Sequence, residues 1–377
     1  MKQGWEYKRF EACINKTSKP KQVKTEEYNS GTKYPIVSQE DKLISGYYDD
    51  ESYVFHIDSP VVIFGDHTRV LKYIDFDFVV GADGVKIISP KQELNAKFLL
   101  YYLQWYKIPN LGYSRHYKLL KEIQIPLPPK STQLSIVSEL DKINELIRLK
   151  KEQLKDYDNL AQSIFYEMFG DPVENDKGWE VKKLGEVCSL ICNGNTPKGG
   201  SEVYVKEGFL FLRSQNVWKN RIDLEDVAYI DESTHLSLKK SILKHNDLLI
   251  TKTGRINTEN SSLGRTALFE GGDGSANING HVYLVRLKEN MVHKYILYIL
   301  ISNSYRELIR KTCVGGIDKR QLNKDHIEDF PIIFPPIELQ KIYSNRVSII
   351  ERQKSSVQKS ITDLETLLAS RMQYWFE

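Results

Sequence analysis

Apolar residues recur three and four positions apart over two long stretches of the chain, residues 131–169 and 338–376. Neither stretch contains glycine or proline, so the spacing predicts two α-helices of ~39 residues, each roughly 58 Å long. The second stretch repeats the pattern of the first 207 residues later, and an apolar seam of this length needs a partner helix. We therefore expect the two helices to pair through these seam residues: Ile136, Leu140, Ile143, Ile147, Leu154, Val347, Ile350, Val357, Ile361, Leu364 and Leu368.

Charged and proline residues mark the ends and the register of both predicted helices. Lys150, Lys354 and Arg371 interrupt the seam, and we hypothesise that they set the register of the pair. Prolines favour the first turn of a helix, where no backbone donor is needed. A proline pair and an early glutamine open each helix at matching positions, Pro128-Pro129 with Gln133 and Pro335-Pro336 with Gln340.

The repetition extends into the segments that precede the helices. Gly4-Trp-Glu recurs at Gly178-Trp-Glu, and the stretch 97–103 recurs at 294–300. A duplicated module, with loop insertions in its second copy, explains both matches. We expect a globular domain at 1–127, a long helix at 128–170, a second globular domain at 171–334 and a second long helix at 335–377.

Within each predicted domain the apolar pattern is mixed. Short apolar runs at 61–64, 247–251 and 282–287 predict strands, while 97–105 and 294–301 predict short amphipathic helices. The expected fold class is α+β: two β-rich domains separated by two long antiparallel coiled-coil helices, with a pseudo-two-fold internal repeat.

Composition changes this picture only slightly. The 377 residues include 41% apolar and 27% charged residues, with a net charge of +3. A nucleic-acid-binding surface would therefore be local rather than spread over the whole chain. The sequence begins without an apolar signal region, has no run of 18 apolar residues, and contains four scattered cysteines. These features predict a cytoplasmic protein that has no membrane span.

The motifs of common catalytic sites do not occur in the sequence. No glycine-rich cofactor loop, Walker loop or Asn/Asp-Pro-Pro-aromatic clamp is present. Asp171, Glu180 and Lys182 could imitate a Mg²⁺-dependent nuclease, but their order and their place at a domain junction favour a structural strand. Cys188 and Cys192 lack a second ligand pair for zinc. We therefore expect a chain that is not itself catalytic and binds no metal.

Polar and basic side chains follow matched strands in both copies. Arg and Lys read guanine edges and Asn and Gln read adenine edges, although the cations also bind phosphate without sequence information. A single such residue is usually an ordinary surface charge, but recurrence at one topological position favours binding. The candidate DNA-binding residues are Gln39, His67, Thr68, Arg69 and Lys72 in the first copy, and Arg213, Gln215, Asn216, Lys252, Thr253, Arg255 and Asn257 in the second.

Basic turns lie just before each long helix. Arg115 and Lys118 occur in the first, and Arg320 occurs in the second beside a pair of glycines. These side chains could reach a DNA phosphate or cap the preceding helix, and the sequence leaves both alternatives open.

Taken together, these motifs resemble the specificity subunit of type I restriction-modification systems over essentially the whole chain. The proline pair with Gln133, the segment Leu160–Pro172 and the repeated Gly-Trp-Glu contribute most to the resemblance. It implies a non-catalytic subunit whose two domains each read half of a split double-stranded DNA target, with the helices fixing the spacer. It also implies two modification subunits that carry S-adenosylmethionine, and restriction subunits that use ATP and Mg²⁺; this chain would bind no cofactor.

Two alternatives stay open at this stage. The chain could serve a related system whose nuclease is fused to its methyltransferase, or it could be a coiled-coil scaffold that does not bind DNA. A recognition subunit predicts a steep dependence of DNA affinity on salt, whereas a scaffold predicts none.

Overall fold

The computed structural model describes residues 4–17, 20–112, 114–256, 258, 260–316 and 318–377. The chain forms two compact units, the first comprising Met1–Gln153 and Val357–Glu377 and the second Leu154–Ser356. Each unit contains one copy of the duplicated sequence together with parts of both long helices. Among the described residues, no helix has the length and apolar content that crossing a membrane requires.

Two four-stranded sheets form the core of the first unit. One is antiparallel, with the strand order β2-β9-β6-β7: β2 (Ile14–Asn15), β9 (Val85–Pro90), β6 (Val61–Gly65) and β7 (Leu71–Ile74). The other has the order β4-β3-β8-β5, with β3 and β8 parallel: β4 (Gly46–Tyr48), β3 (Tyr34–Val37), β8 (Phe78–Val80) and β5 (Val54–Phe55). Helix α1 (Ala96–Tyr106) packs Phe98 and Leu99 against the first sheet, and α2 (Tyr117–Leu120) follows.

The second unit repeats most of this topology. Its antiparallel sheet has the order β12-β22-β18-β20: β12 (Cys188–Asn193), β22 (Val282–Leu287), β18 (Leu248–Thr251) and β20 (Thr266–Leu268). Its second sheet has the order β13-β17-β14-β21, with β14 and β21 parallel: β13 (Tyr204–Val205), β17 (Ala228–Ile230), β14 (Phe209–Leu212) and β21 (Ala276–Ile278). Helix α6 (His293–Leu300) takes the place of α1. The antiparallel sheets have the same strand order, and β17-β14-β21 repeats β4-β3-β8, but the edge strand differs, because β5 pairs with β8 whereas β13 pairs with β17. The shared strands confirm the α+β class and the internal repeat.

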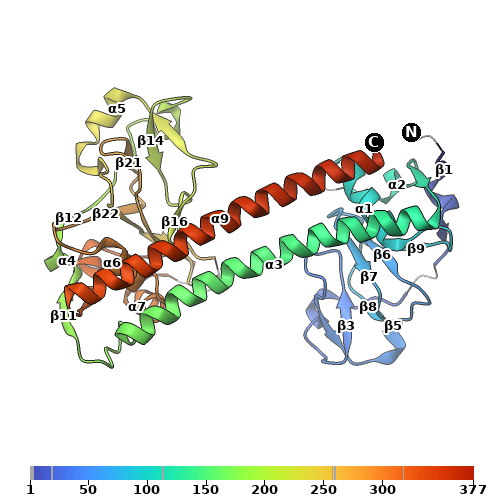
Figure 1. Ribbon diagram of the computed structural model, residues 1–377, viewed down its shortest axis with the longest axis horizontal. Helices are drawn as coiled ribbons and strands as arrows, with labels where there is room; N and C mark the ends of the chain where they lie inside the picture. The colour runs from blue at the N-terminus through green and yellow to red at the C-terminus, as the bar shows by residue number, and fades with distance from the viewer. Residues whose placement is uncertain (1–3, 18–19, 113, 257, 259, 317) are drawn as a thin grey trace. The chain divides into compact units, whose positions relative to one another are not determined.

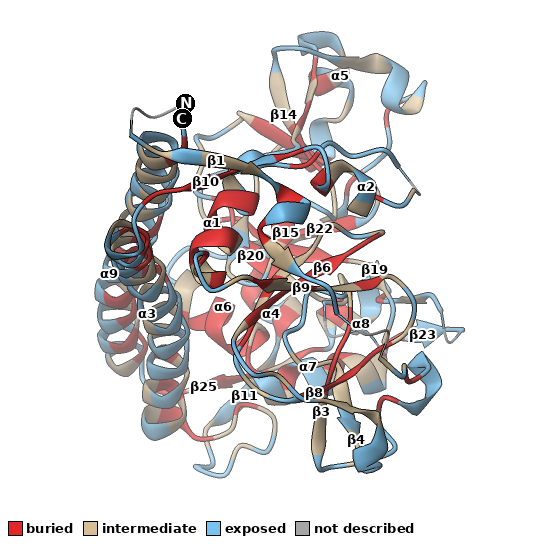
Figure 2. Ribbon diagram, turned by 90° about the vertical axis from the view of Figure 1, so that its right-hand side faces the viewer, coloured by how far each residue is buried: buried red, intermediate tan, exposed pale blue. Residues whose placement is uncertain are grey.

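Insertions enlarge the second unit. They add the hairpin β15 (Val217–Trp218) and β16 (Arg221–Ile222), a small sheet of β19 (Thr253–Gly254), β24 (Arg320–Gln321) and β23 (Val314–Gly315), and helices α5 (Glu232–Ser237) and α7 (Asn303–Thr312). The remaining short helices are α4 (Leu184–Val187), α8 (Lys324–Glu328), η1 (Phe10–Ala12), η2 (Thr25–Glu27), η3 (Glu51–Tyr53), η4 (Gly200–Val203) and η5 (Lys239–Ser241). Figure 2 shows buried residues concentrated in the sheets and in α1 and α6.

A two-stranded ribbon leads into each long helix. β1 (Glu6–Arg9) pairs with β10 (Gln124–Leu127), and β11 (Glu180–Lys183) pairs with β25 (Pro331–Phe334). The buried amide of Gln133 donates to the Pro128 carbonyl at 2.9 Å, and Gln340 donates to Pro335 at the same distance. The repeated proline and glutamine thus close the start of each helix, where backbone carbonyls of the preceding loop need donors.

The long helices are α3 (Lys130–Phe169) and α9 (Ile337–Phe376), which run in opposite directions (Figure 1). In the first unit, Ile136 and Leu140 pack with Phe376. In the second unit, Val347 and Ile350 pack with Phe165 of α3. The pairing of two long helices confirms the fold predicted from the heptad pattern. Of the predicted seam residues, eight are buried and Leu154, Leu364 and Leu368 are half-buried.

Candidate nucleic-acid interface

A loop cluster of the first unit brings together Gln39, His67 and Thr68. Gln39 follows β3, while His67 and Thr68 follow β6, so the cluster joins loops from the two sheets. The Gln39 side chain accepts from the His67 backbone at 3.2 Å and donates to the Asp83 carbonyl at 3.0 Å. Thr68 donates to the Gln39 carbonyl at 2.6 Å. These bonds fix the loops relative to each other.

The side chains of Arg69 and Lys72 both donate to backbone carbonyls within the first unit. Arg69 has a left-handed backbone (φ 62°) and donates to the Ile108 carbonyl at 3.1 Å. Lys72 is only 5% exposed, and its ammonium donates to the carbonyls of Ser38 and Lys42 at 2.8 and 2.5 Å. Burial lowers the pKa of Lys72, with Glu40 and Asp41 opposing that shift. Lys72 therefore supports the Gln39 loop from beneath.

Arg115 and Lys118 are exposed beside the turn that contains His67. The fully buried His116 anchors them, because its Nε2 accepts from the Leu111 backbone at 3.0 Å and its Nδ1 bonds the Asp66 carbonyl at 2.9 Å. The first of these bonds leaves the ring proton on Nδ1. The structure thus brings the basic turn of the sequence to the Gln39 cluster through Asp66.

In the second unit, Arg213, Gln215 and Asn216 lie together after β14. Asn216 is 2% exposed and ties the turn, because its side chain accepts from the Arg213 backbone at 2.9 Å and donates to the Asp223 carbonyl at 3.0 Å. Arg213 and Gln215 share the exposed carboxylate of Asp226, with N–O distances of 3.2 and 2.8 Å. For either side chain to contact a base edge or a phosphate, that ligand would have to displace the Asp226 carboxylate.

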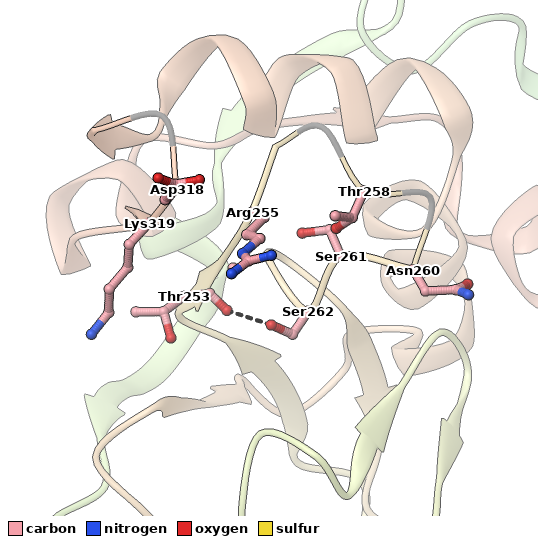
Figure 3. A pocket seen from close by; sticks show the side chains of 9 residues that line it. Thr253, Arg255, Thr258, Asn260, Ser261, Ser262, Asp318 and Lys319 are labelled. Atoms are coloured by element: carbon pink, nitrogen blue, oxygen red, sulfur yellow. Dashed lines mark hydrogen bonds between the residues drawn. The ribbon is translucent and has the colours of Figure 1, made fainter. Parts of the chain in front are cut away.

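A polar pocket of about 320 Å³ follows β18 (Figure 3). Thr253 and Arg255 line it, and Ser262 closes one side by donating to the Thr253 carbonyl at 2.7 Å. Asp318 and Lys319 complete the wall and Arg255 is exposed. Asn257 lies outside the described residues. The pocket offers hydroxyl and cationic groups together with the carboxylate of Asp318.

Two other candidates, Lys252 and Arg320, have their side chains near other groups of the second unit. The Lys252 ammonium lies 5.8 Å from the centre of the Tyr283 ring. Arg320 donates to the Cys313 carbonyl at 3.3 Å, directly after α7, which corresponds to the helix-capping alternative. Ser262, Asp318 and Lys319 also line the pocket but were not among the residues predicted from the sequence. The glycine-flanked turn before Arg320 is the sequence feature that could have indicated Asp318 and Lys319.

The residues weighed for metal or nuclease chemistry have structural roles. No group of His, Cys, Asp or Glu that could hold a metal ion occurs in the described part of the chain. Burial raises the pKa of Cys188 to about 12, which keeps this thiol protonated. Asp171 accepts from the backbone of Val173 and Glu174 at 2.8 and 3.0 Å, and so closes the turn after α3.

Comparison with known proteins gives one consistent family. The family model for the type I restriction modification DNA specificity domain matches residues 2–156 and 176–366. The EcoR124I/EcoR124II specificity subunit of Escherichia coli is 23% identical over 85% of this chain and 80% of its own length.

Other relatives agree in sequence or in fold. A putative MjaX specificity subunit of Methanocaldococcus jannaschii is 23% identical over 54% of this chain, and the match spans about half (46%) of that relative. The crystal structure of a type I S subunit from M. genitalium matches with a TM-score of 0.58, 15% identity and coverage of 99% of this chain and 96% of the other. The last comparison supports the fold.

Proposed function

The chain belongs to the type I restriction-modification DNA specificity family, and from this we propose that it recognises a split double-stranded DNA target. Each unit reads one half of the target, and the paired helices set the unspecified spacer between the halves. The chain supplies recognition and no catalytic group.

The observation that carries this proposal is the recurrence of one loop in both units. β6 lies between β9 and β7, and β18 lies between β22 and β20 at the same position of the second unit. His67 and Thr68 follow β6, and Thr253 and Arg255 follow β18. A duplicated fold that presents polar and cationic side chains at the same place suits two related half-sites.

The chemistry of modification and cleavage then falls to partner subunits. The chain has no glycine-rich cofactor loop and no clamp for a target adenine. Two modification subunits would bring S-adenosylmethionine, and restriction subunits would bring ATP and Mg²⁺. These partners would also add DNA contacts, which suits the small net charge of +3.

Methylation mapping tests the proposal directly. The chain would be co-expressed with the modification subunit of its own system, and methylated adenines would be mapped in the host DNA. We expect a split motif with adenines modified on opposite strands. Replacing residues 1–127 with the corresponding domain of a relative should change one half of the motif only. Random methylation, or a motif that changes in both halves, would contradict the two-unit reading.

A point variant sharpens this test. Arg255→Ala should relax the motif in the half read by the second unit, since a bidentate contact to guanine discriminates by about 1–3 kcal/mol. Arg352→Ala, which removes an exposed arginine from α9, is the matched control and should leave the motif unchanged.

A further inference from the structure

A third turn of the first unit lies between the loops that carry the candidates Gln39 and His67. It spans residues 81–84 and joins β8 of one sheet to β9 of the other. Its backbone donates to the carbonyl of Val37, the last residue of β3, at 2.9 Å. It also accepts from the backbone of Asp66, the residue after β6, at 2.7 Å. The turn is therefore bonded to the ends of both strands that lead into the candidate loops.

The second unit has the same turn at residues 279–281, between β21 and β22. Its backbone donates to the carbonyl of Leu212, the last residue of β14, at 3.0 Å. It accepts from the backbone of Lys252, the residue after β18, at 2.8 Å. Both copies of the fold thus tie this turn to the same two strand ends, although the second turn is one residue shorter.

Close packing holds the first turn around one exposed carboxylate, that of Asp83. The Gln39 amide donates to the Asp83 carbonyl at 3.0 Å, and the Tyr28 hydroxyl accepts from the Ala82 backbone at 2.9 Å. Gly84 has φ 97°, and a Cβ there would lie 2.7 Å from Oε1 of Gln39. Within the described part of the chain, no hydrogen bond or ion pair reaches the Asp83 carboxylate, which is exposed. The backbone of the turn is fixed while this side chain stays available.

His281 is the exposed side chain of the second turn. Its backbone amide donates to the side-chain oxygen of Asn279 at 3.0 Å, which closes the turn. No described residue forms a hydrogen bond or ion pair with the imidazole ring. At one topological position, the first unit therefore offers an unpaired carboxylate and the second an unpaired imidazole.

These two groups suit different atoms of a base edge. An ionised carboxylate can only accept hydrogen bonds. In the major groove, the donors are the exocyclic amines, N4 of cytosine and N6 of adenine. A neutral imidazole has one N–H donor and can bond the N7 acceptor of a purine, which a carboxylate cannot do.

We propose that Asp83 determines specificity at one position of the first half-site by accepting a hydrogen bond from the exocyclic amine of a cytosine or an adenine. His281 determines specificity at one position of the second half-site by donating to N7 of a purine. This inference rests on the proposed function and deepens it, because it names the base groups that the two turns contact.

Methylation mapping of point variants tests the assignment. The full chain would be co-expressed with the modification subunit of its own system. Asp83→Ala should relax one position in the half assigned to the first unit, and His281→Ala one position in the other half. Asp58→Ala and His245→Ala are the matched controls, because these exposed residues lie before β6 and β18, at the opposite ends of the strands from the turns. Both controls should leave the motif unchanged.

Base analogues identify the contacted atom in a binding assay with the purified complex. Purine in place of adenine, or 2-pyrimidinone in place of cytosine, removes only the amine. On this change the wild-type complex should lose roughly 10- to 100-fold more affinity than the Asp83→Ala complex. Both complexes sense the same loss of base pairing, so the difference isolates the contact. The analogue that gives the difference tells adenine from cytosine, and a 7-deazapurine gives the corresponding measurement for His281.

Other outcomes overturn the assignment. If the wild-type complex methylates no split motif, the proposed function itself fails. If it methylates one and both variants reproduce it, the proposed function stands and the assignment of the turns is wrong. If Asp83→Ala keeps the motif but binds every duplex more tightly, its carboxylate faces phosphates and reads no base. Both variants should keep the urea midpoint of the original chain, since the side chains are exposed; a relaxed motif with a lowered midpoint and no analogue difference would mean a structural role.

Discussion

Asp247 controls the start of the strand that leads to the second recognition turn. Its buried carboxylate accepts from Arg286 at 2.8 and 2.7 Å and from the Lys244 backbone at 2.7 Å. Arg286 belongs to β22 and Asp247 precedes β18, so this two-pronged ion pair clamps neighbouring strands. β18 ends at Thr251, directly before the turn with Thr253 and Arg255. The Asp247–Arg286 ion pair therefore fixes the start of β18, and the turn with Thr253 and Arg255 follows the other end of this strand.

Replacing Asp247 with alanine should destabilise the protein by about 3–5 kcal/mol, since the guanidinium of Arg286 is left half-buried without its carboxylate. Urea unfolding of the full chain measures the change. Asp329→Ala removes an exposed partner of Lys183 and should have a far smaller effect, because water screens that pair. Equal effects of the two substitutions would show that the Asp247 pair stabilises no more than a surface contact.

The direction of individual side chains was the part of the site that sequence could not predict. Lys72 and Arg255 are both cations that follow matched strands, yet Lys72 is buried under a loop and Arg255 is exposed. Asn216 has the chemistry of a base reader and bonds its own turn instead. Each outcome depends on carbonyl groups that distant loops bring near, and a one-dimensional pattern holds no information on them.

At the level of elements, the long helices could be predicted and the sheets only in part. Helix periodicity is local, so the seam around Leu140 is visible in the sequence. The parallel pairing of β3 with β8, and of β14 with β21, joins strands that are separated by other strands along the chain. Such pairing depends on tertiary packing, and short apolar runs do not encode their partners.

The helix pair offers a matched test of this packing. Leu140 is fully buried, while Leu146, on the same helix, is 48% exposed. Leu140→Ala should reduce the free energy of unfolding by about 2–5 kcal/mol, the usual cost of a buried leucine truncation, and Leu146→Ala should stay within about 0.5 kcal/mol. Denaturant unfolding of both variants measures the difference. Similar costs at the two positions would contradict the seam.

An ion pair between the helices should make the stability of the pair depend on pH. Glu139 of α3 accepts from Arg371 and, at 3.0 Å, from the Trp375 indole. The bond from Arg371 lowers the pKa of Glu139 below its usual 4.5, against an opposing effect of burial. The pKa of Glu139 is thus lower in the folded chain than in the unfolded chain. The ion pair with Arg371 therefore stabilises the fold above pH 4.5, and this stabilisation is lost as the pH falls through the folded pKa.

Glu139→Gln should therefore lower the free energy of unfolding near neutral pH. It should also make that free energy fall less steeply as the pH is lowered. The midpoint of urea unfolding, measured from pH 3 to about 7, reports both changes. Glu122→Gln, at an exposed position, is the control. The midpoint of Glu139→Gln could instead fall in acid as steeply as that of the original chain. The Arg371 pair would then not contribute to the register of the helices, contrary to the hypothesis drawn from the seam.

At the scale of the whole molecule, the duplication places the two ends of the sequence in a defined setting. In the first unit, Trp5 and Phe376 both pack against Phe98, with ring centroids 6.4 and 5.5 Å from it. In the second unit, the equivalent Trp179 donates from its indole to the Phe169 carbonyl at 2.8 Å. There the covalent turn 170–178 joins the two residues. In the first unit the equivalent residues, Phe376 and Trp5, also lie against one ring, but no covalent turn joins them.

A circular permutant should consequently fold and recognise the same DNA. Phe376 would be joined to Gly4 through a copy of the sequence 170–177, and the chain would be opened between Asp176 and Lys177. The permutant gains one short loop and loses another of similar length, so the entropy costs of closing the loops nearly cancel. The urea midpoint should therefore stay close to that of the original chain. The methylated motif should also be unchanged, since each unit keeps its sheets and both helix ends. A permutant that folds but modifies a different motif would mean that the order of the units along the chain, rather than the paired helices, sets the arrangement of the half-sites.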